Sequence, residues 1–103
     1  MSQICLVTGA SRGIGNAIAI ELATKGYTVI GTGTSIASAE KVTNDLRTAG
    51  AGGRGAVLDV NDPEQVESVI KDITDEFGSI SVLVNNAGVT EDNLLMRMKP
   101  SQW

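Results

Sequence analysis

The chain has no histidine, a single cysteine and few aromatic residues. Its 103 residues include one tyrosine, one phenylalanine and one tryptophan. With Cys5 alone and no histidine, the sequence offers no internal disulfide, no Cys–His nucleophile pair and no cysteine–histidine metal site. Because Cys5 lies in the apolar run Ile4–Val7, we expect it to be a small buried core residue. The scarcity of aromatics means that the core must consist of isoleucine, valine, leucine and alanine.

A strong charge of one sign and long hydrophobic runs are also missing. The net charge is -4, which weighs against nucleic acid or an anionic membrane as the partner, because phosphate surfaces call for a basic patch. No stretch is long enough to cross a bilayer, and the first residues show no secretory or transit signal. With 42% hydrophobic and 19% charged residues, we expect one globular domain in the reducing cytoplasm. A bound dinucleotide is compatible with the negative net charge, because backbone N–H groups can hold its phosphates.

Four short apolar runs predict strands at residues 4–7, 27–30, 56–58 and 80–84. They lack clean polar alternation, as expected of strands that are covered on both faces in a parallel sheet. Segments with helical spacing lie between them, so the order is β-α-β-α-β-α-β. Right-handed crossovers fold this order into a doubly wound parallel sheet of the α/β class, with helices on both faces. The glycine-rich residues 50–55 could mark a domain boundary, but we expect them only to join the second helix to the third strand.

The three helices are predicted from apolar spacing and from their end signals. The first should run from Ile14 to about Lys25. The third should begin with Asp62 as N-cap, Pro63 at the first helical position and Gln65 in a capping box. The predicted apolar faces comprise, in chain order, Ile14, Ala17, Ile18 and Leu22; then Ala39, Val42, Leu46 and Ala49; then Val66, Val69, Ile70, Ile73 and Phe77.

A glycine-rich turn joins the first strand to the first helix. It reads TGASRGIG over residues 8–15. Glycines here permit a tight turn and let the backbone approach a pyrophosphate, while the helix N-terminus offers unpaired N–H groups to the anion. A tight turn with no ligand is the alternative if no other segment supports binding. The spacing G-x-x-x-G-x-G is one residue longer at the front than the common G-x-G-x-x-G fingerprint.

Two motifs resemble those of the short-chain dehydrogenase/reductase family. Residues 8–15 resemble its TGxxxGxG motif, and NNAG at residues 85–88 resembles its NNAG signature. The resemblance implies a Rossmann-type fold that binds a nicotinamide cofactor. Independently, two carboxamides at a strand end can satisfy neighbouring backbone groups and shape the crevice where open α/β sheets bind ligands. An asparagine-rich turn that merely closes the strand is the alternative.

The residues at the ends of the second and third strands indicate whether the cofactor is NAD or NADP and where its adenine lies. An NAD site usually has an acid about 20 residues past the glycines, but residues 31–35 read GTGTS and the next acid is Glu40. Thr34 leaves room for a 2′-phosphate and Arg12 supplies positive charge, so we expect NADP(H). The alternative for Arg12 is a solvated surface residue. Asp59 resembles the family residue that borders the adenine, or it simply caps a loop. The predicted cofactor-binding residues are Gly9, Ser11, Arg12, Gly13, Ile14, Gly15, Thr34, Asp59, Val60, Asn86, Ala87 and Gly88.

The last segment indicates a substrate. Residues 85–103, NNAGVTEDNLLMRMKPSQW, resemble the corresponding part of family members that act on 3-oxoacyl groups carried by acyl carrier protein, and residues 92–98 are the most discriminating. The resemblance implies NADPH-dependent reduction to the 3-hydroxyacyl form in fatty acid synthesis, usually by a homotetramer. A family member that acts on a steroid, a sugar or a small ketone is an alternative.

The catalytic residues implied by the family do not occur in this sequence. The reduction needs a tyrosine as proton donor, a lysine that lowers its pKa and a serine that orients the substrate. The one tyrosine, Tyr27, is followed four residues later by Gly31 and not by the lysine of Tyr-x-x-x-Lys. We therefore expect residues 1–103 to be a single NADP(H)-binding domain that is truncated on its C-terminal side and inactive alone. A real short product that binds a nucleotide or a partner without catalysis is the alternative.

Overall fold

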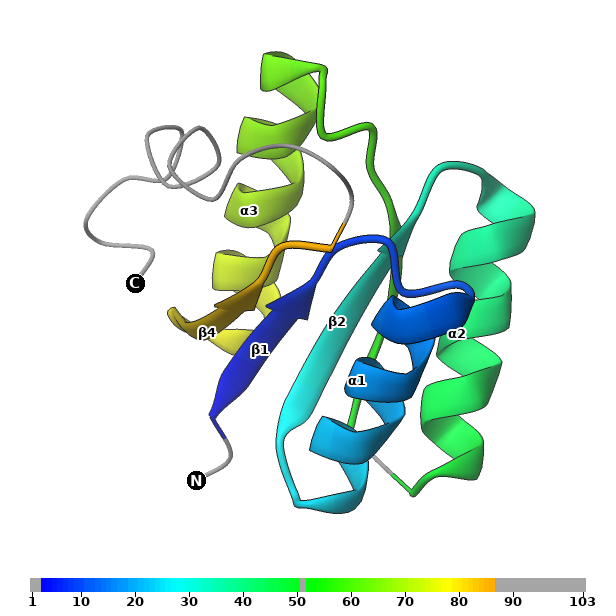
Figure 1. Cartoon of the computed structure of the whole chain (residues 1–103). Coiled ribbons are helices and arrows are strands. Elements are labelled where there is room, and N and C mark those ends of the chain that lie inside the picture. Colours follow the sequence, from blue (N-terminus) through cyan, green and yellow to red (C-terminus); the bar gives the residue numbers. More distant parts are fainter. Residues whose placement is uncertain (1–2, 51, 87–103) are drawn as a thin grey trace.

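Strands and helices alternate along the part of the chain described by the computed structural model, which comprises residues 3–50 and 52–86 (Figure 1). The strands are all parallel and lie in the order β3-β2-β1-β4. This arrangement confirms the predicted doubly wound, Rossmann-type α/β sheet. The elements are β1 (Ile4–Val7), α1 (Gly13–Thr24), β2 (Thr28–Gly33), α2 (Ile36–Thr48), β3 (Gly53–Val57), α3 (Pro63–Phe77) and β4 (Ile80–Val84).

The sheet is covered on both faces, so β1, β2 and β4 each contribute side chains to two cores. Helices α1 and α2 lie on one face and α3 on the other (Figure 1). In β1, Cys5 and Val7 pack with the core on the α1 and α2 side, whereas Ile4 and Leu6 pack with the core on the α3 side. All four are buried, which explains why this run shows no polar alternation. The expectation that Cys5 is a buried core residue is confirmed.

Helices α2 and α3 bury the faces predicted for them. Asp62 caps α3 by accepting from the backbone N–H groups of Glu64 and Gln65, and Pro63 is the first helical residue. Gly78, with φ of 111°, ends that helix. The buried side chains are Ala39, Val42 and Leu46 in α2 and Val66, Ile70 and Ile73 in α3, with Val69 and Phe77 partly buried beside them.

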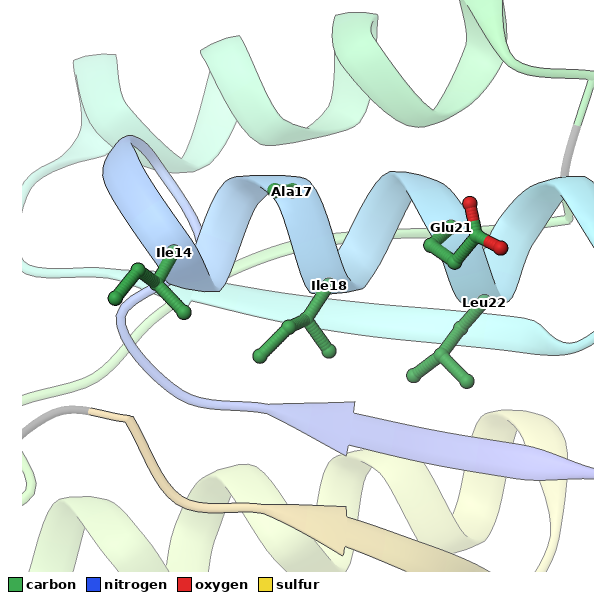
Figure 2. A pocket seen from close by; sticks show the side chains of 5 residues that line it. All are labelled: Ile14, Ala17, Ile18, Glu21 and Leu22. Atoms are coloured by element: carbon green, nitrogen blue, oxygen red, sulfur yellow. The ribbon is translucent and has the colours of Figure 1, made fainter.

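The apolar face predicted for α1 is wrong except at Leu22, which is partly buried and packs against the core on the α1 and α2 side. Its buried residues are Gly15, Ala19 and Ala23, spaced four apart, whereas Ile14 is 73% exposed. These small residues face the sheet because they let the helix backbone come close to it. The larger aliphatic side chains therefore lie on a flank of the helix and not on the side that faces the sheet. Figure 2 shows Ile14, Ile18 and Leu22 on the side of α1 that faces away from α2. With Ala17 and Glu21 they line an open groove of about 440 Å³.

Two strands differ in their bounds from the prediction. Strand β2 continues to Gly33, three residues beyond Ile30, and β3 begins at Gly53, inside the glycine-rich stretch. Gly55 pairs with Gly31 in the sheet, and a Cβ on Gly55 would lie 2.0 Å from the carbonyl oxygen of Ala39 in α2. These glycines therefore permit strand pairing and close helix contact. They do not merely connect two elements.

Candidate functional site

The carboxyl ends of the four parallel strands meet at one edge of the sheet, and the predicted site residues gather there (Figure 1). The glycine turn follows β1, Thr34 follows β2, Asp59 follows β3 and Asn86 follows β4. The strand order reverses between β1 and β4, and open α/β sheets bind ligands at such a point. Ala87 and Gly88, also predicted for the site, lie outside the described residues.

The glycine turn ends in a helix start that no side chain caps. Gly9 and Gly13 have φ values of 63° and 65°, a left-handed conformation that favours glycine. Arg12 is the N-cap of α1, and its side chain makes no capping hydrogen bond. A Cβ on Gly13 would meet no described atom within 4 Å, so the turn is open on that side. Free N–H groups beside open space form the arrangement in which helix N-termini bind phosphate.

Gly15 allows α1 to touch the turn and the end of β4. A Cβ on Gly15 would lie 2.0 Å from the carbonyl oxygen of Gly9 and 2.6 Å from Nδ2 of Asn86. Nδ2 of Asn86 donates to that same carbonyl oxygen at 3.2 Å. The expectation that a carboxamide here satisfies a neighbouring backbone group is thereby confirmed for Asn86. The turn, the helix and the fourth strand are joined at one point.

Two buried threonines support the turn, and neither is among the predicted site residues. The hydroxyl of Thr8 donates to Oδ1 of Asn85 at 3.1 Å and accepts from the backbone N–H of Asn86 at 2.9 Å. Oγ1 of Thr32 accepts from the backbone N–H of Gly9 at 3.2 Å. A sequence signal existed, since Thr8 opens the TGxxxGxG motif and a threonine at the end of a buried strand needs polar partners.

A pocket of about 100 Å³ lies between the ends of β2 and β3, and its lining includes four predicted site residues, Gly9, Thr34, Asp59 and Val60. Asp59 is exposed, and its Oδ1 accepts from the backbone N–H of Asn61 at 2.9 Å. The loop-capping role considered for Asp59 is thus present, whereas its contact with adenine stays a prediction. Val60 is 5% exposed and packs into the α3-side core, so it forms the floor of the pocket.

Gln65 positions Asp59, and the capping box predicted for it is wrong in detail. Oε1 of Gln65 accepts from the backbone N–H of Asp59 at 3.0 Å, while the backbone N–H of Asp62 donates to the carbonyl of Asp59. Nε2 of Gln65 donates to the carboxylate of Asp62 at 3.1 Å. The side chain therefore ties the start of α3 to the pocket, because the loop brings Asp59 within its reach.

Arg12 and Thr34 are both exposed, and neither side chain has a hydrogen bond or ion pair with another residue in the described part of the chain. The exposure of Arg12 is compatible with both interpretations of it, a solvated surface residue and a phosphate ligand, so its contact with a phosphate stays a prediction. Ser35, next to Thr34, is engaged as the cap of α2, where its Oγ accepts from the backbone N–H of Ser38 at 3.1 Å. The side chains that a 2′-phosphate would need are therefore unengaged.

The carboxyl edge of the sheet combines candidate phosphate donors with a pocket, and the described residues show no candidate metal site. They contain no group of three or more histidine, cysteine, aspartate or glutamate residues that could hold a metal ion, and no helix among them could span a membrane. Burial raises the pKa of the Cys5 thiol to about 11, so it is not a nucleophile at neutral pH. An uncapped helix start, an exposed arginine and an adjacent pocket match the donors and the space that a phosphate-linked nucleotide requires.

Comparison with known proteins agrees with this geometry. Residues 3–103 match the family described as short chain dehydrogenase. The chain is 55% identical over 101 residues to the 3-oxoacyl-[acyl-carrier-protein] reductases FabG of Vibrio cholerae and Escherichia coli, which covers 98% of this chain and 40% of each relative. The corresponding reductase of Pseudomonas aeruginosa is 50% identical, with 41% of its length covered. The chain thus spans about 40% of the length of these relatives. Since the match includes almost every residue, the chain belongs to the short-chain dehydrogenase family.

Proposed function

We propose that this chain is the NADP(H)-binding domain of a longer reductase, one that converts 3-oxoacyl-[acyl-carrier-protein] to the 3-hydroxyacyl form in fatty acid biosynthesis. The observation that carries the proposal is the junction of Gly9, Gly15 and Asn86 beside an uncapped helix start. The 55% identity to reductases of that name supports the choice of substrate. Short-chain reductases with another carbonyl substrate are the second candidate.

The cofactor would lie along the carboxyl edge of the sheet. Its pyrophosphate would face the turn from Gly9 to Gly15, which includes Ser11, Gly13 and Ile14 and presents the N–H groups that start α1. Its adenine would enter the pocket lined by Asp59 and Val60. Asn86, Ala87 and Gly88 would border the nicotinamide side. When bound, the cofactor supplies the hydride, and this chain's residues supply its position.

The preference for NADP(H) rests on Arg12 and Thr34. Both side chains are exposed and unengaged within the described structure, and no acid stands at the end of β2 to bond a ribose 2′-hydroxyl. A dianionic 2′-phosphate would gain a charged partner in Arg12 and a hydroxyl donor in Thr34. NADH has a neutral 2′-hydroxyl in place of this phosphate, so it offers Arg12 no charged partner there.

Proton transfer belongs to the part of the longer protein beyond this domain. Tyr27 stands at the amino end of β2, on the opposite edge of the sheet from the glycine turn. We therefore propose that the longer protein carries the catalytic tyrosine, lysine and serine, forms a homotetramer and works in the cytoplasm, and that this domain alone is inactive.

Fluorescence titration with NADPH and NADH tests the cofactor assignment. We expect NADPH to bind more tightly, and Arg12→Ala to weaken NADPH by roughly tenfold with little effect on NADH, because only NADPH has the 2′-phosphate. Equal affinity of the parent for both cofactors would overturn the assignment. Glu67→Ala, on the exposed surface of α3, is a control that should change neither affinity.

Two further measurements separate the candidate functions. Intact mass of the protein in its source cells distinguishes a 10.7 kDa product from one about two and a half times larger, the size that the matched relatives suggest. The larger form should oxidise NADPH when given an acetoacetyl thioester. Failure of that assay with retained NADPH binding would favour another carbonyl substrate, and a 10.7 kDa product would favour a non-catalytic nucleotide-binding protein.

A further inference from the structure

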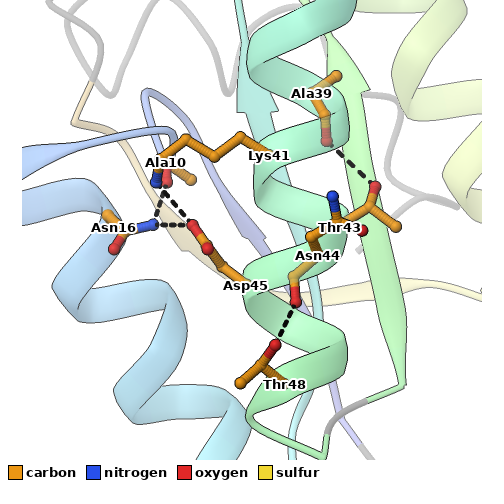
Figure 3. Close-up of polar contacts among 8 residues, drawn as sticks. All are labelled: Ala10, Asn16, Ala39, Lys41, Thr43, Asn44, Asp45 and Thr48. Atoms are coloured by element: carbon orange, nitrogen blue, oxygen red, sulfur yellow. Dashed lines mark hydrogen bonds and ion pairs between the residues drawn. The ribbon is translucent and has the colours of Figure 1, made fainter.

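A polar relay joins the glycine turn to α2 through α1 (Figure 3). Nδ2 of Asn16, the fourth residue of α1, donates to the carbonyl oxygen of Ala10 at 3.0 Å and to Oδ2 of Asp45 at 2.9 Å. The same carboxylate oxygen accepts from Nζ of Lys41 at 2.8 Å. The relay formed by Ala10, Asn16, Asp45 and Lys41 thus links the glycine turn and the start of α1 to α2, with 29 positions between Asn16 and Asp45.

Both contacts of Asn16 require an amide nitrogen. The carbonyl of Ala10 can only accept, and so can an ionised Asp45. The hydrogen bond from Lys41, helped by the one from Asn16, lowers the pKa of Asp45 and keeps it ionised at neutral pH. Two acceptors use the two Nδ2 hydrogens, so the orientation of the side-chain amide is fixed.

Ala10 is held on its other sides as well. It is fully buried, and its backbone N–H donates to the carbonyl of Thr32 at 2.8 Å. A Cβ on Gly31 would lie 2.7 Å from the methyl group of Ala10, so this methyl packs directly on the backbone of β2. The carbonyl held by Asn16 is the last polar group of Ala10, and residues 11–13, which lead into α1, follow it immediately.

We propose that Asn16 is a positioning residue for dinucleotide binding, because by holding the carbonyl of Ala10 it fixes the turn in the shape that presents the start of α1 to phosphate. This inference rests on the proposed function of the site. Asn16 acts through the turn and does not touch the cofactor in this account. Preorganisation of the turn favours binding because the ordering of these residues precedes the arrival of the ligand. Asp45 and Lys41 hold the amide in place from α2.

The test compares NADPH with adenosine, a ligand that lacks both the pyrophosphate and the 2′-phosphate and so does not use the turn or Arg12. Asn16→Ala should weaken NADPH by roughly tenfold, as expected for the loss of one well-placed hydrogen bond, and adenosine by less than about twofold. The conservative Asp45→Asn keeps an acceptor for Asn16 and should bind NADPH within about twofold of the parent. Asn44→Ala makes the same substitution on the exposed face of α2 and controls for helix propensity.

The outcomes separate this inference from the proposed function. If the parent binds NADPH and Asn16→Ala binds it equally well, or loses both ligands alike, the positioning role is wrong. If the parent binds neither ligand, the proposed function fails, and amide hydrogen exchange decides the positioning role. Faster exchange in Asn16→Ala at Gly9 and Ala10, whose N–H groups donate to Thr32, with α2 still protected, would support it. Unchanged exchange at these amides would overturn it.

Discussion

Replacement of Gly15 by alanine should separate α1 from the glycine turn. In an ordinary helix this change stabilises the protein by about 1 kcal/mol. Here the new Cβ would lie 2.0 Å from the carbonyl oxygen of Gly9, and since real Cβ contacts below 3.0 Å essentially do not occur, helix and turn must move apart by about 1 Å. The same movement disturbs the 3.2 Å hydrogen bond from Asn86 to Gly9.

The expected loss follows from these opposing effects. Overpacking against a backbone atom costs about 3 kcal/mol, the upper part of the usual range, and the gain in helix propensity offsets about 1 kcal/mol of it. We therefore expect Gly15→Ala to lower the free energy of unfolding by about 2 kcal/mol, measured by urea denaturation, and the melting temperature by roughly 8–16 °C. NADPH binding should weaken in parallel, since the displaced turn is part of the site.

A matched glycine tests the steric argument. Gly52 has no positive φ, and a Cβ there would lie 3.7 Å from Oγ1 of Thr28, an ordinary contact distance. Gly52→Ala should change the free energy of unfolding by less than about 0.5 kcal/mol. The reasoning would be refuted if Gly15→Ala unfolded at the same urea concentration as the parent, or at a higher one.

Three further predictions concern the core and the turn. Thr8→Val, similar in shape, should cost about 1–3 kcal/mol because it removes the partner of the Asn86 backbone N–H, whereas Thr8→Ser should cost less; urea denaturation measures both. Ile14→Ser should change stability by less than about 0.5 kcal/mol because Ile14 is 73% exposed, whereas Ile70→Ala, in the core, should cost about 2–5 kcal/mol; equal losses would contradict the burial of α1 described above. The Cys5 thiol should resist a thiol reagent at pH 8 until urea unfolds the protein. The pKa of this thiol in the folded protein, about 11, exceeds the ordinary value of 9.0. The contribution of Cys5 to the free energy of unfolding is therefore fully present below pH 9 and is lost as the pH rises toward 11. A free energy of unfolding that stays constant between pH 9 and pH 11 would contradict the burial argument.

The sheet could be predicted because each strand includes at least part of a short apolar run, and segments with helical spacing separate these runs. Helices α2 and α3 could be predicted because only one face of each is apolar. Helix α1 carries two candidate stripes, one of large aliphatic residues from Ile14 and one of small residues from Gly15. The choice between them depends on how closely the helix approaches the sheet, which local spacing does not specify. Prediction from size alone therefore selected the wrong face.

The candidate site could be predicted as segments but not as contacts. The glycine turn and the asparagines after β4 were recognised from motifs. The junction of these two segments depends on hydrogen bonds of Thr8 with Asn85 and Asn86. These bonds join residues that are separated by 77 and 78 positions in the sequence. The bond from Asn16 to Asp45 likewise joins two helices across 29 positions. Such pairs follow from the strand order, so they became visible only with the fold.

The central claim, that the carboxyl edge of this sheet binds NADPH, is tested most directly by NMR of the isotope-labelled chain titrated with NADPH. The account predicts saturable shifts concentrated in the amides of residues 9–15, Thr34, Asp59 and Asn86, with smaller shifts on addition of NADH. The absence of saturable shifts, or shifts confined to the groove lined by Ile14, Ile18 and Leu22, would contradict it.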